Sequence, residues 1–203
     1  MLECFFDCSS PWTYFGFRGV QALAAELGVE IAWRPFLVGG VFNTVNPSVY
    51  AARAATQPPL KDRYLQKDLA DWARFYGVRM RFPPSRFPVN SVKAMRGCLW
   101  LEPQGRLVTF AEQVFDAYWG ADRDISQDEV LAEVCQAVGV DAQAFFAGIA
   151  QLQVKEALKA NTEELIARGG FGTPTFFVNG SDMYFGNDRL PLVRAALTRA
   201  PDT

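Results

Sequence analysis

Strand-like sequence occurs only near the two ends of this chain, and this distribution restricts the folds that it can adopt. At the N-terminal end, short apolar runs predict strands over Leu2 to Asp7 and Val29 to Trp33. Between them, Pro11 begins a helix that continues to about Leu27, with Gly28 ending it. Two strands joined by one helix form a β-α-β unit, so we expect parallel pairing with a right-handed crossover.

At the C-terminal end, the sequence predicts a hairpin followed by a helix. Strands are expected over Thr175 to Val178 and Met183 to Phe185, because they flank Asn179-Gly180, a strong two-residue turn signal. The last helix is predicted from Leu190 to about Arg199. The predicted order of elements at this end of the chain is therefore strand, strand, helix.

The long middle segment has helical patterns and no strand-like runs. Helices are predicted around residues 61–76, 91–100, 109–119, 127–138 and 142–167. Lys61, Lys67 and Asp68 are expected to be solvated charges on the first of these helices. The fold class is therefore α/β, with one domain formed by residues 1–36 and 169–203 and an all-helical insertion of residues 37–168.

The composition excludes several kinds of site. The chain has no histidine, so it cannot assemble a Ser-His-Asp or Cys-His catalytic set or a histidine-ligated metal site, and we expect no metal. Its 20 basic and 22 acidic residues are mixed along the chain, so we expect no nucleic-acid partner. The N-terminus lacks a signal-peptide pattern and no apolar run is long enough to span a membrane, which predicts a cytoplasmic protein without a membrane partner.

The cysteines do not form a redox pair. Cys4, Cys8, Cys98 and Cys135 are scattered without a C-x-x-C spacing, which favours reduced thiols in the core over disulfides. Cys8 lies at the end of the first predicted strand and not at the helix N-terminus, so we expect it to be buried and unreactive.

The segment Ser10-Pro11-Trp12-Thr13 lies where the first strand ends and the first helix begins. Thioredoxin folds keep their reactive group at this junction, because the helix N-terminus stabilises an anion there. DsbA-like oxidoreductases have Cys-Pro-x-Cys in this frame, and this chain has oxygen in place of both sulfurs, so it cannot exchange disulfides itself. Ser10 can either cap the helix or donate a hydrogen bond to the thiolate of a bound cofactor.

A second motif, Gly172-Thr173-Pro174-Thr175, precedes the third predicted strand. In thioredoxin folds the residue at the Pro174 position is a cis proline that faces the reactive motif, and the backbone before it pairs with a peptide-like ligand. Thr173 would supply those backbone contacts. The alternative is an ordinary proline at the start of a strand.

A third motif, Gly186-Asn187-Asp188-Arg189, precedes the last helix. Asp188 is placed to be the N-cap of that helix. Alternatively, Asp188 can hold the ammonium of an α-amino-acid group, while Asn187 and backbone N–H groups hold its carboxylate.

Taken together, these motifs resemble the family that contains the 2-hydroxychromene-2-carboxylate isomerases and the kappa-class glutathione transferases, which have a DsbA-like thioredoxin fold. The resemblance covers nearly the whole chain. It rests on Phe6-Asp7, Ser10-Pro11, Arg34 to Gly40, Phe82-Pro83, Asn90, Gly172 to Thr175 and Gly186 to Arg189.

The resemblance implies a glutathione site. Ser10 would face the glutathione sulfur as the catalytic residue, and the other cofactor contacts would come from Pro11, Trp12, Thr56, Thr173, Pro174, Asn187 and Asp188. In the isomerases the glutathione thiolate adds to an enone-like carbon, a bond rotates, and the thiol leaves again. A histidine-free chain suits this chemistry, because the cofactor brings the nucleophile.

The substrate contacts differ from the family pattern. The isomerases have a lysine after the second strand and an Asn-Arg pair further on, whereas this chain has Asn43 at the first position and Thr56-Gln57 before Pro58-Pro59. We expect Asn43, Asn46 and Arg86 to face the substrate, with Arg86 replacing the missing positive charge.

Several functions remain open on these residues. The first is a glutathione-dependent isomerase of a small aromatic or enone compound, as in aromatic catabolism. A kappa-class-like glutathione transferase is the alternative, and a non-redox thioredoxin-fold binding module is the third. Relatives are often dimers, which leaves a homodimer open.

Overall fold

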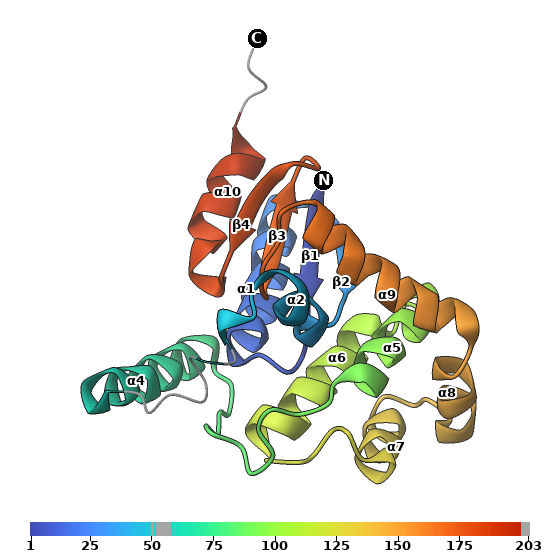
Figure 1. The fold of residues 1–203 in the computed structure, drawn as a ribbon. Helices are drawn as coiled ribbons and strands as arrows, with labels where there is room; N and C mark the ends of the chain where they lie inside the picture. Colours follow the sequence, from blue (N-terminus) through green and yellow to red (C-terminus); the bar gives the residue numbers. More distant parts are fainter. Residues whose placement is uncertain (50, 52–57, 200–203) are drawn as a thin grey trace.

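The computed structural model of the protein describes residues 1–49, 51 and 58–199, and its centre is a mixed four-stranded sheet (Figure 1). The strands are β1 (Leu2–Phe6), β2 (Ile31–Pro35), β3 (Thr175–Val178) and β4 (Asp182–Phe185), in the order β2-β1-β3-β4. β1 is parallel to β2 and antiparallel to β3, and β3 is antiparallel to β4. The predicted α/β fold with strands at both ends of the chain is confirmed.

Helices cover both faces of the sheet because alternate side chains of a strand point to opposite faces. On one face, Cys4 and Phe6 pack with residues of α1 (Pro11–Leu27) and α10 (Leu190–Thr198). On the other face, Phe5 packs with residues of α2 (Val38–Val45) and α9 (Leu152–Ala167). The sheet is therefore the middle layer of three.

The remaining helices lie between β2 and β3 in the sequence. They are α4 (Pro59–Tyr76), α5 (Val92–Leu101), α6 (Leu107–Phe115), α7 (Asp128–Ala137) and α8 (Ala142–Ile149). A 3-10 turn, Glu102–Gln104, follows α5, and a π-helical turn, Asp116–Gly120, follows α6. Residues of α5, α6, α7 and α8 share one hydrophobic core with α1 and the sheet, whereas α4 projects to the side and packs on α1 (Figure 1).

Two of the differences from the predicted boundaries have a clear structural cause. β2 begins at Ile31, two residues later than predicted, because the Val29 N–H bonds to Ala24 O at 3.0 Å and so belongs to the end of α1. The single helix predicted over residues 142–167 is two helices, α8 and α9, separated at Ala150 and Gln151. The chain turns there because α8 lies against α5, where a Cβ on Gly148 would be 2.3 Å from Trp100 Cε2, while α9 runs back to β2 and α2.

Helix α2 was not predicted, and contacts from distant parts of the chain stabilise it. Its first turn donates hydrogen bonds from Val38 N to Asp7 Oδ2 at 2.9 Å and from the preceding Leu37 N to Thr162 Oγ1 at 3.1 Å. Val41 and Phe42 pack in the same cluster as Phe5. These partners replace the side-chain cap that the helix lacks.

Candidate functional site

Ser10 is the N-cap of α1, with extended backbone and with Pro11 as the first helical residue. Its Oγ accepts a hydrogen bond from Thr13 N at 3.4 Å, so the predicted capping role is confirmed. Because a hydroxyl has one proton and two lone pairs, this bond leaves the Ser10 proton available to a ligand. The unpaired N–H groups and the dipole of α1 give this position a partial positive charge.

Thr173 and Pro174 lie against the start of α1. The peptide bond between them is cis, as predicted. Thr173 Oγ1 accepts a hydrogen bond from Asp7 N at 3.2 Å and lies 2.8 Å from Thr13 Oγ1. The backbone N–H and C=O of Thr173 make no hydrogen bond with any residue that the structure describes, so both are open to a ligand.

Asn187 and Asp188 lie in a 3-10 turn, Asn187–Arg189, that leads into α10. Gly186 precedes it with φ 106, a conformation that favours glycine, and its N–H bonds to Pro174 O at 3.0 Å. The Asn187 side chain is buried, and its Nδ2 has no hydrogen-bond partner among the described residues. The N-cap predicted at Asp188 is wrong, because Arg189 is the cap residue and Asp188 is inside the turn, paired with Arg189 at 2.5 Å.

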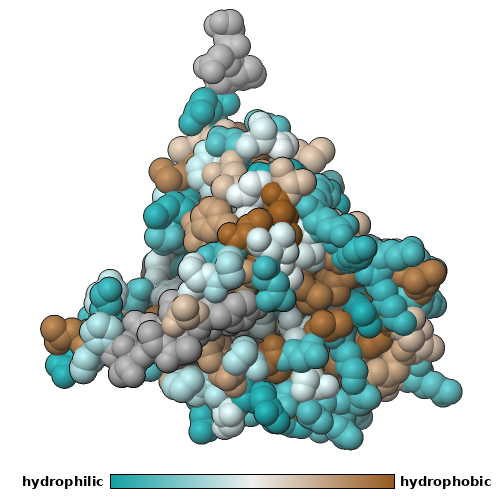
Figure 2. All heavy atoms as spheres, viewed as in Figure 1, coloured by the Kyte–Doolittle hydropathy of each residue, from teal (hydrophilic) through white to brown (hydrophobic). Residues whose placement is uncertain are grey.

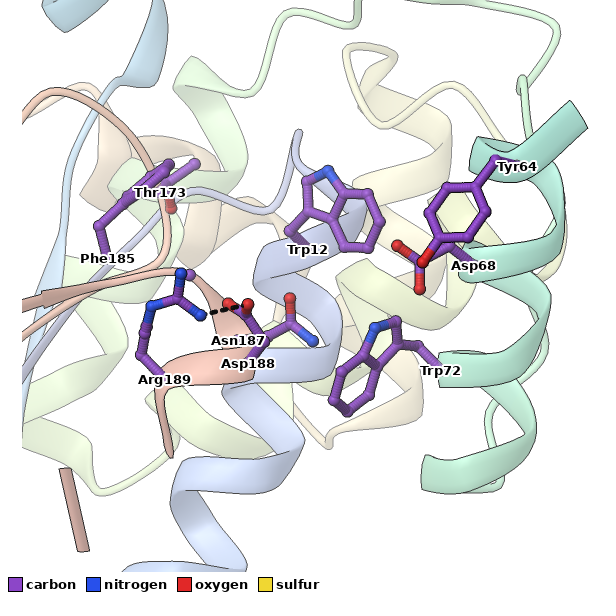
Figure 3. A pocket seen from close by; sticks show the side chains of 10 residues that line it. Trp12, Tyr64, Asp68, Trp72, Thr173, Phe185, Asn187, Asp188 and Arg189 are labelled. Carbon is purple, nitrogen blue, oxygen red and sulfur yellow. Dashed lines mark hydrogen bonds and ion pairs between the residues drawn. The ribbon is translucent and has the colours of Figure 1, made fainter. Parts of the chain in front are cut away.

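These segments border a cavity of about 570 Å³ between α1, α4 and the turn before α10 (Figure 3). Its lining residues are Trp12, Tyr64, Asp68, Trp72, Thr173, Phe185, Gly186, Asn187, Asp188 and Arg189. The structure therefore brings together four predicted cofactor residues, Trp12, Thr173, Asn187 and Asp188. Ser10 lies two residues before Trp12 and is not part of the lining itself.

One wall of this cavity comes from α4, and sequence reasoning missed Tyr64 and Asp68 as lining residues. Tyr64, Asp68 and Trp72 recur every four residues, so they share one face of the helix. Stacking holds that face in place, because the Trp72 ring lies 6.5 Å from the ring of Phe15 in α1. Asp68 is half-buried in this wall, and the expectation that it is a solvated charge stays a prediction. The aromatic side chains of Tyr64 and Trp72 at helical spacing were the signal that could have identified the wall.

The predicted substrate residues do not line the cavity. Asn43 is an exposed residue of α2, and Asn46 ends that helix, with its Nδ2 3.5 Å from Phe171 O. The Arg86 side chain is 71% exposed and its Nε lies 3.5 Å from Asp124 Oδ2. Thr56 lies outside the described residues, and the roles of all four residues stay predictions.

A second, smaller cavity lies beside Ser9. It has a volume of about 310 Å³ and is bordered by Asp7, Ser9, the first turn of α2 and residues 88–92. The Asp7 carboxylate accepts hydrogen bonds from Ser9 N at 3.0 Å and Val38 N at 2.9 Å. Burial raises the pKa of Asp7, and these hydrogen bonds oppose the rise.

Among the described residues, all four cysteines are free and buried, as expected. No group of histidine, cysteine and acidic side chains suited to a metal ion occurs in the described ranges. None of the helices that the structure describes combines the length and apolar character needed to cross a membrane, and the face in Figure 2 shows apolar side chains as scattered patches among polar ones.

Comparison with known proteins places this geometry in a family. The model of the DSBA-like thioredoxin domain matches residues 1–198. The chain belongs to this family. Within the DSBA-like family it is similar to the 2-hydroxychromene-2-carboxylate isomerase of Pseudomonas putida, with 28% identity over 202 residues that cover 98% of this chain and 95% of the relative.

Two further comparisons agree with the resemblance found in the motifs. Glutathione S-transferase kappa 2 of Caenorhabditis elegans is 28% identical over 211 residues, covering 95% of this chain and 89% of the relative. A solved structure of a 2-hydroxychromene-2-carboxylate isomerase matches with a TM-score of 0.80 and 26% identity, covering 97% of this chain and 93% of that one. The predicted resemblance to the isomerases and kappa-class transferases is confirmed.

Proposed function

We propose that this protein is an enzyme that uses glutathione to isomerise a small aromatic or enone compound. The observation that carries the proposal is Asn187, a lining residue of the large cavity whose buried NH₂ group has no hydrogen-bond partner among the described residues. Leaving a buried donor unpaired costs about 1–3 kcal/mol, which a ligand that accepts the hydrogen bond would offset. Glutathione has two carboxylates that can do so.

The cavity has donors and acceptors suited to a peptide-like thiol. The backbone N–H and C=O of Thr173 would pair with the cysteinyl residue, as in the addition of a strand to a sheet edge. The turn at Asn187 and Asp188 would lie against the γ-glutamyl end. A volume of about 570 Å³ is within the range of cavities that bind small molecules.

Ser10 would act on the sulfur at the start of α1. Its hydroxyl donates a hydrogen bond to the thiolate, and the α1 dipole stabilises the negative charge, so both lower the pKa of the bound thiol. The glutathione thiolate supplies the nucleophile for reversible addition to a conjugated carbon. The chain offers no nucleophilic thiol of its own, because its four cysteines are buried.

A glutathione transferase of the kappa type is the second candidate, supported by the similarity to the Caenorhabditis elegans relative. It would use the same cofactor residues, so stoichiometry separates the two. An isomerase turns over many substrate molecules per glutathione, whereas a transferase consumes one glutathione per product.

Calorimetric titration of glutathione tests the site. We expect binding to the wild-type protein, and weaker binding to Asn187→Leu, which removes the buried donor but retains a side chain of similar size. Ser10→Gly is expected to bind glutathione but to raise the pKa of the bound thiol, which its thiolate absorbance reports, while largely preserving the helix cap. Absence of wild-type binding would refute the proposal and favour a binding module without the cofactor.

A positive titration justifies a screen of conjugated aromatic acids at catalytic glutathione concentrations. We expect a change in substrate absorbance without loss of free thiol. Consumption of one thiol per substrate would instead identify the transferase.

A further inference from the structure

The small cavity beside Ser9 has mostly apolar walls. The apolar side chains that border it are Leu37, Val38, Phe42, Pro88, Val89 and Val92. Among the described residues of its lining, Asp7 is the one charged residue, and none is a lysine or an arginine. The volume of about 310 Å³ is at the lower end of the range for cavities that bind small molecules. The cavity therefore suits a small, largely apolar molecule.

The polar groups around Asp7 are already engaged with its carboxyl group. Ser9 N and Val38 N donate hydrogen bonds to it at 3.0 Å and 2.9 Å, and the hydroxyls of Ser9 and Ser91 also bond to it. Asp7 itself is 1% exposed. Ionised or protonated, it gives the cavity no positive charge, so this cluster has nothing to pair with a substrate anion.

The basic residues that flank the 88–92 segment in the chain have acidic partners outside the cavity. Lys93 Nζ lies 2.6 Å from Asp128 Oδ1, and Arg86 Nε lies 3.5 Å from Asp124 Oδ2. Neither basic side chain belongs to the lining. Burying an ionised carboxylate without a counter-charge is strongly unfavourable. The cavity therefore discriminates against anionic molecules.

Asn90 supplies the cavity with a neutral hydrogen-bond donor. Its Oδ1 accepts a hydrogen bond from Val92 N at 3.0 Å, which fixes the amide at the start of α5. Its NH₂ group has no partner among the described residues, and the side chain is exposed at the cavity border. An amide NH₂ group donates to a carbonyl oxygen without needing a charge on the ligand.

The segment that contains Ser10 joins the two cavities. Ser9 borders the small cavity and Trp12 borders the large one, with Ser10 between them in the chain. Ser10 N also donates to the backbone oxygen of Asp7 at 3.3 Å. A thiolate held by Ser10 would therefore lie close to residues of both cavities.

We propose that the small cavity holds the electrophilic substrate, that this substrate is an uncharged α,β-unsaturated ketone, and that Asn90 donates a hydrogen bond to its carbonyl oxygen. The assignment rests on the proposed glutathione function and adds the charge class of the substrate and a catalytic residue.

The reaction balances with the groups present. The thiolate forms a C–S bond to the β-carbon, and the π electrons move to the carbonyl oxygen, where the Asn90 N–H stabilises the enolate. The former double bond rotates, the electron pair returns, and the C–S bond breaks to release the thiolate. The site carries one negative charge from the thiolate or enolate throughout, whereas a substrate carboxylate would add a second one.

Calorimetry with two unreactive ketones tests the charge preference. The probes are benzylacetone, which is uncharged, and its para-carboxylate, each titrated into the protein in the presence of glutathione. We expect the wild type to bind benzylacetone about tenfold or more tightly, because the carboxylate is desolvated without a counter-charge.

Gly39 offers a matched pair of variants for placing the site. It borders the cavity, and no described atom lies within 4 Å of its Cβ position. Gly39→Lys adds a cation there and should raise the affinity for the carboxylate about tenfold, whereas Gly39→Gln, with an uncharged side chain, should keep the wild-type preference.

Turnover of cis-benzylideneacetone tests the role of Asn90. Asn90→Ser keeps a side-chain oxygen for Val92 N but removes the NH₂ donor, so kcat should fall about a hundredfold while the affinity for glutathione is unchanged. In the substrate screen, uncharged ketones should be isomerised faster than conjugated acids.

Four results would overturn the assignment while leaving the proposed function intact, provided that glutathione binds. They are a carboxylate bound as tightly as benzylacetone, no binding of benzylacetone, a Gly39→Lys variant with no gain for the carboxylate, or an Asn90→Ser variant with wild-type kcat. Absence of glutathione binding overturns the proposed function and this assignment together. Circular dichroism of each variant separates lost binding from lost folding.

Discussion

Gly16 is the position where α1 approaches the site most closely, and replacing it by alanine tests how tightly the site is packed. A Cβ at Gly16 would lie 2.7 Å from Pro174 Cγ and 3.5 Å from Asn187 Cβ. In an ordinary helix interior the substitution would stabilise the protein by about 1 kcal/mol. Here the new methyl group must displace Pro174 or α1, and such overpacking costs about 1–3 kcal/mol.

Gly39 provides the matched control because it lies in α2 and no described atom is within 4 Å of the Cβ position. Gly39→Ala should therefore show the helix-propensity gain, whereas Gly16→Ala should be less stable than this control by about 1–3 kcal/mol. For a chain of this length, the difference corresponds to roughly 2–12 °C in Tm. Glutathione binding should weaken only in Gly16→Ala, because a displacement of Pro174 also moves the adjoining Thr173, which is proposed to bind the cofactor.

Thermal unfolding followed by circular dichroism, together with calorimetric titration of both variants, provides the measurement. The reasoning about close packing would be refuted if Gly16→Ala were as stable as Gly39→Ala and bound glutathione as the wild type does. A destabilised Gly16→Ala with normal affinity would show that the turn before α10 moves independently of Pro174, contrary to the hydrogen bond between Gly186 N and Pro174 O.

Two further predictions concern charge and thiols. Hydrogen bonds from Arg168 hold the pKa of Glu3 below its usual value. Ionised Glu3 therefore adds its full contribution to the free energy of unfolding above the unfolded-state pKa of about 4.3, and this contribution is lost as the pH falls through the lower folded-state pKa. In urea unfolding, Glu3→Gln should therefore lower the free energy of unfolding by about 1–3 kcal/mol at neutral pH and by progressively less below about pH 4. A decrease that is the same at every pH would contradict this. Burial raises the pKa of all four cysteine thiols, that of Cys135 to about 11, so Ellman's reagent should label none in the native protein and all after unfolding. Rapid labelling of the native protein would show that the core opens.

Local signals were sufficient for the elements at the two ends of the chain. Pro11 and Gly28 mark the limits of α1, and Gly28 has the φ of 65 that such a helix end requires. Asn179 and Gly180 both have positive φ, as the predicted two-residue turn demands. In these places the residue type itself restricts the backbone, so no tertiary information was needed.

Helix α2 could not be predicted because its stabilising contacts are remote in the sequence. Gly39 and Gly40 in its first turn disfavour a helix, and it has no side-chain cap. Its N–H partners come from β1, through Asp7, and from α9, through the Thr162 hydroxyl that accepts from Leu37 N. No local pattern reports such contacts.

The candidate site shows the same division. Ser10, Thr173 and Asn187 could be found because each belongs to a short motif at the start of a helix or strand. Asp68 belongs to a regular amphipathic helix, and the sequence pattern predicts which residues share a face of that helix but not which element the face contacts. The contact of α4 with α1, through Trp72 and Phe15, is known only from the structure.

The contact between Thr13 and Thr173 has a consequence for protein engineering. Thr13 is fully buried and its hydroxyl lies 2.8 Å from Thr173 Oγ1, so the second position of the motif is occupied by a hydrogen bond to another segment. Introducing Ser10→Cys and Thr13→Cys to build an oxidoreductase would replace that hydroxyl by a weakly hydrogen-bonding sulfur facing the Thr173 side chain. A dithiol built at these two positions would therefore place its second sulfur against the Thr173 hydroxyl, so the residue at position 173 also bears on the geometry of that dithiol.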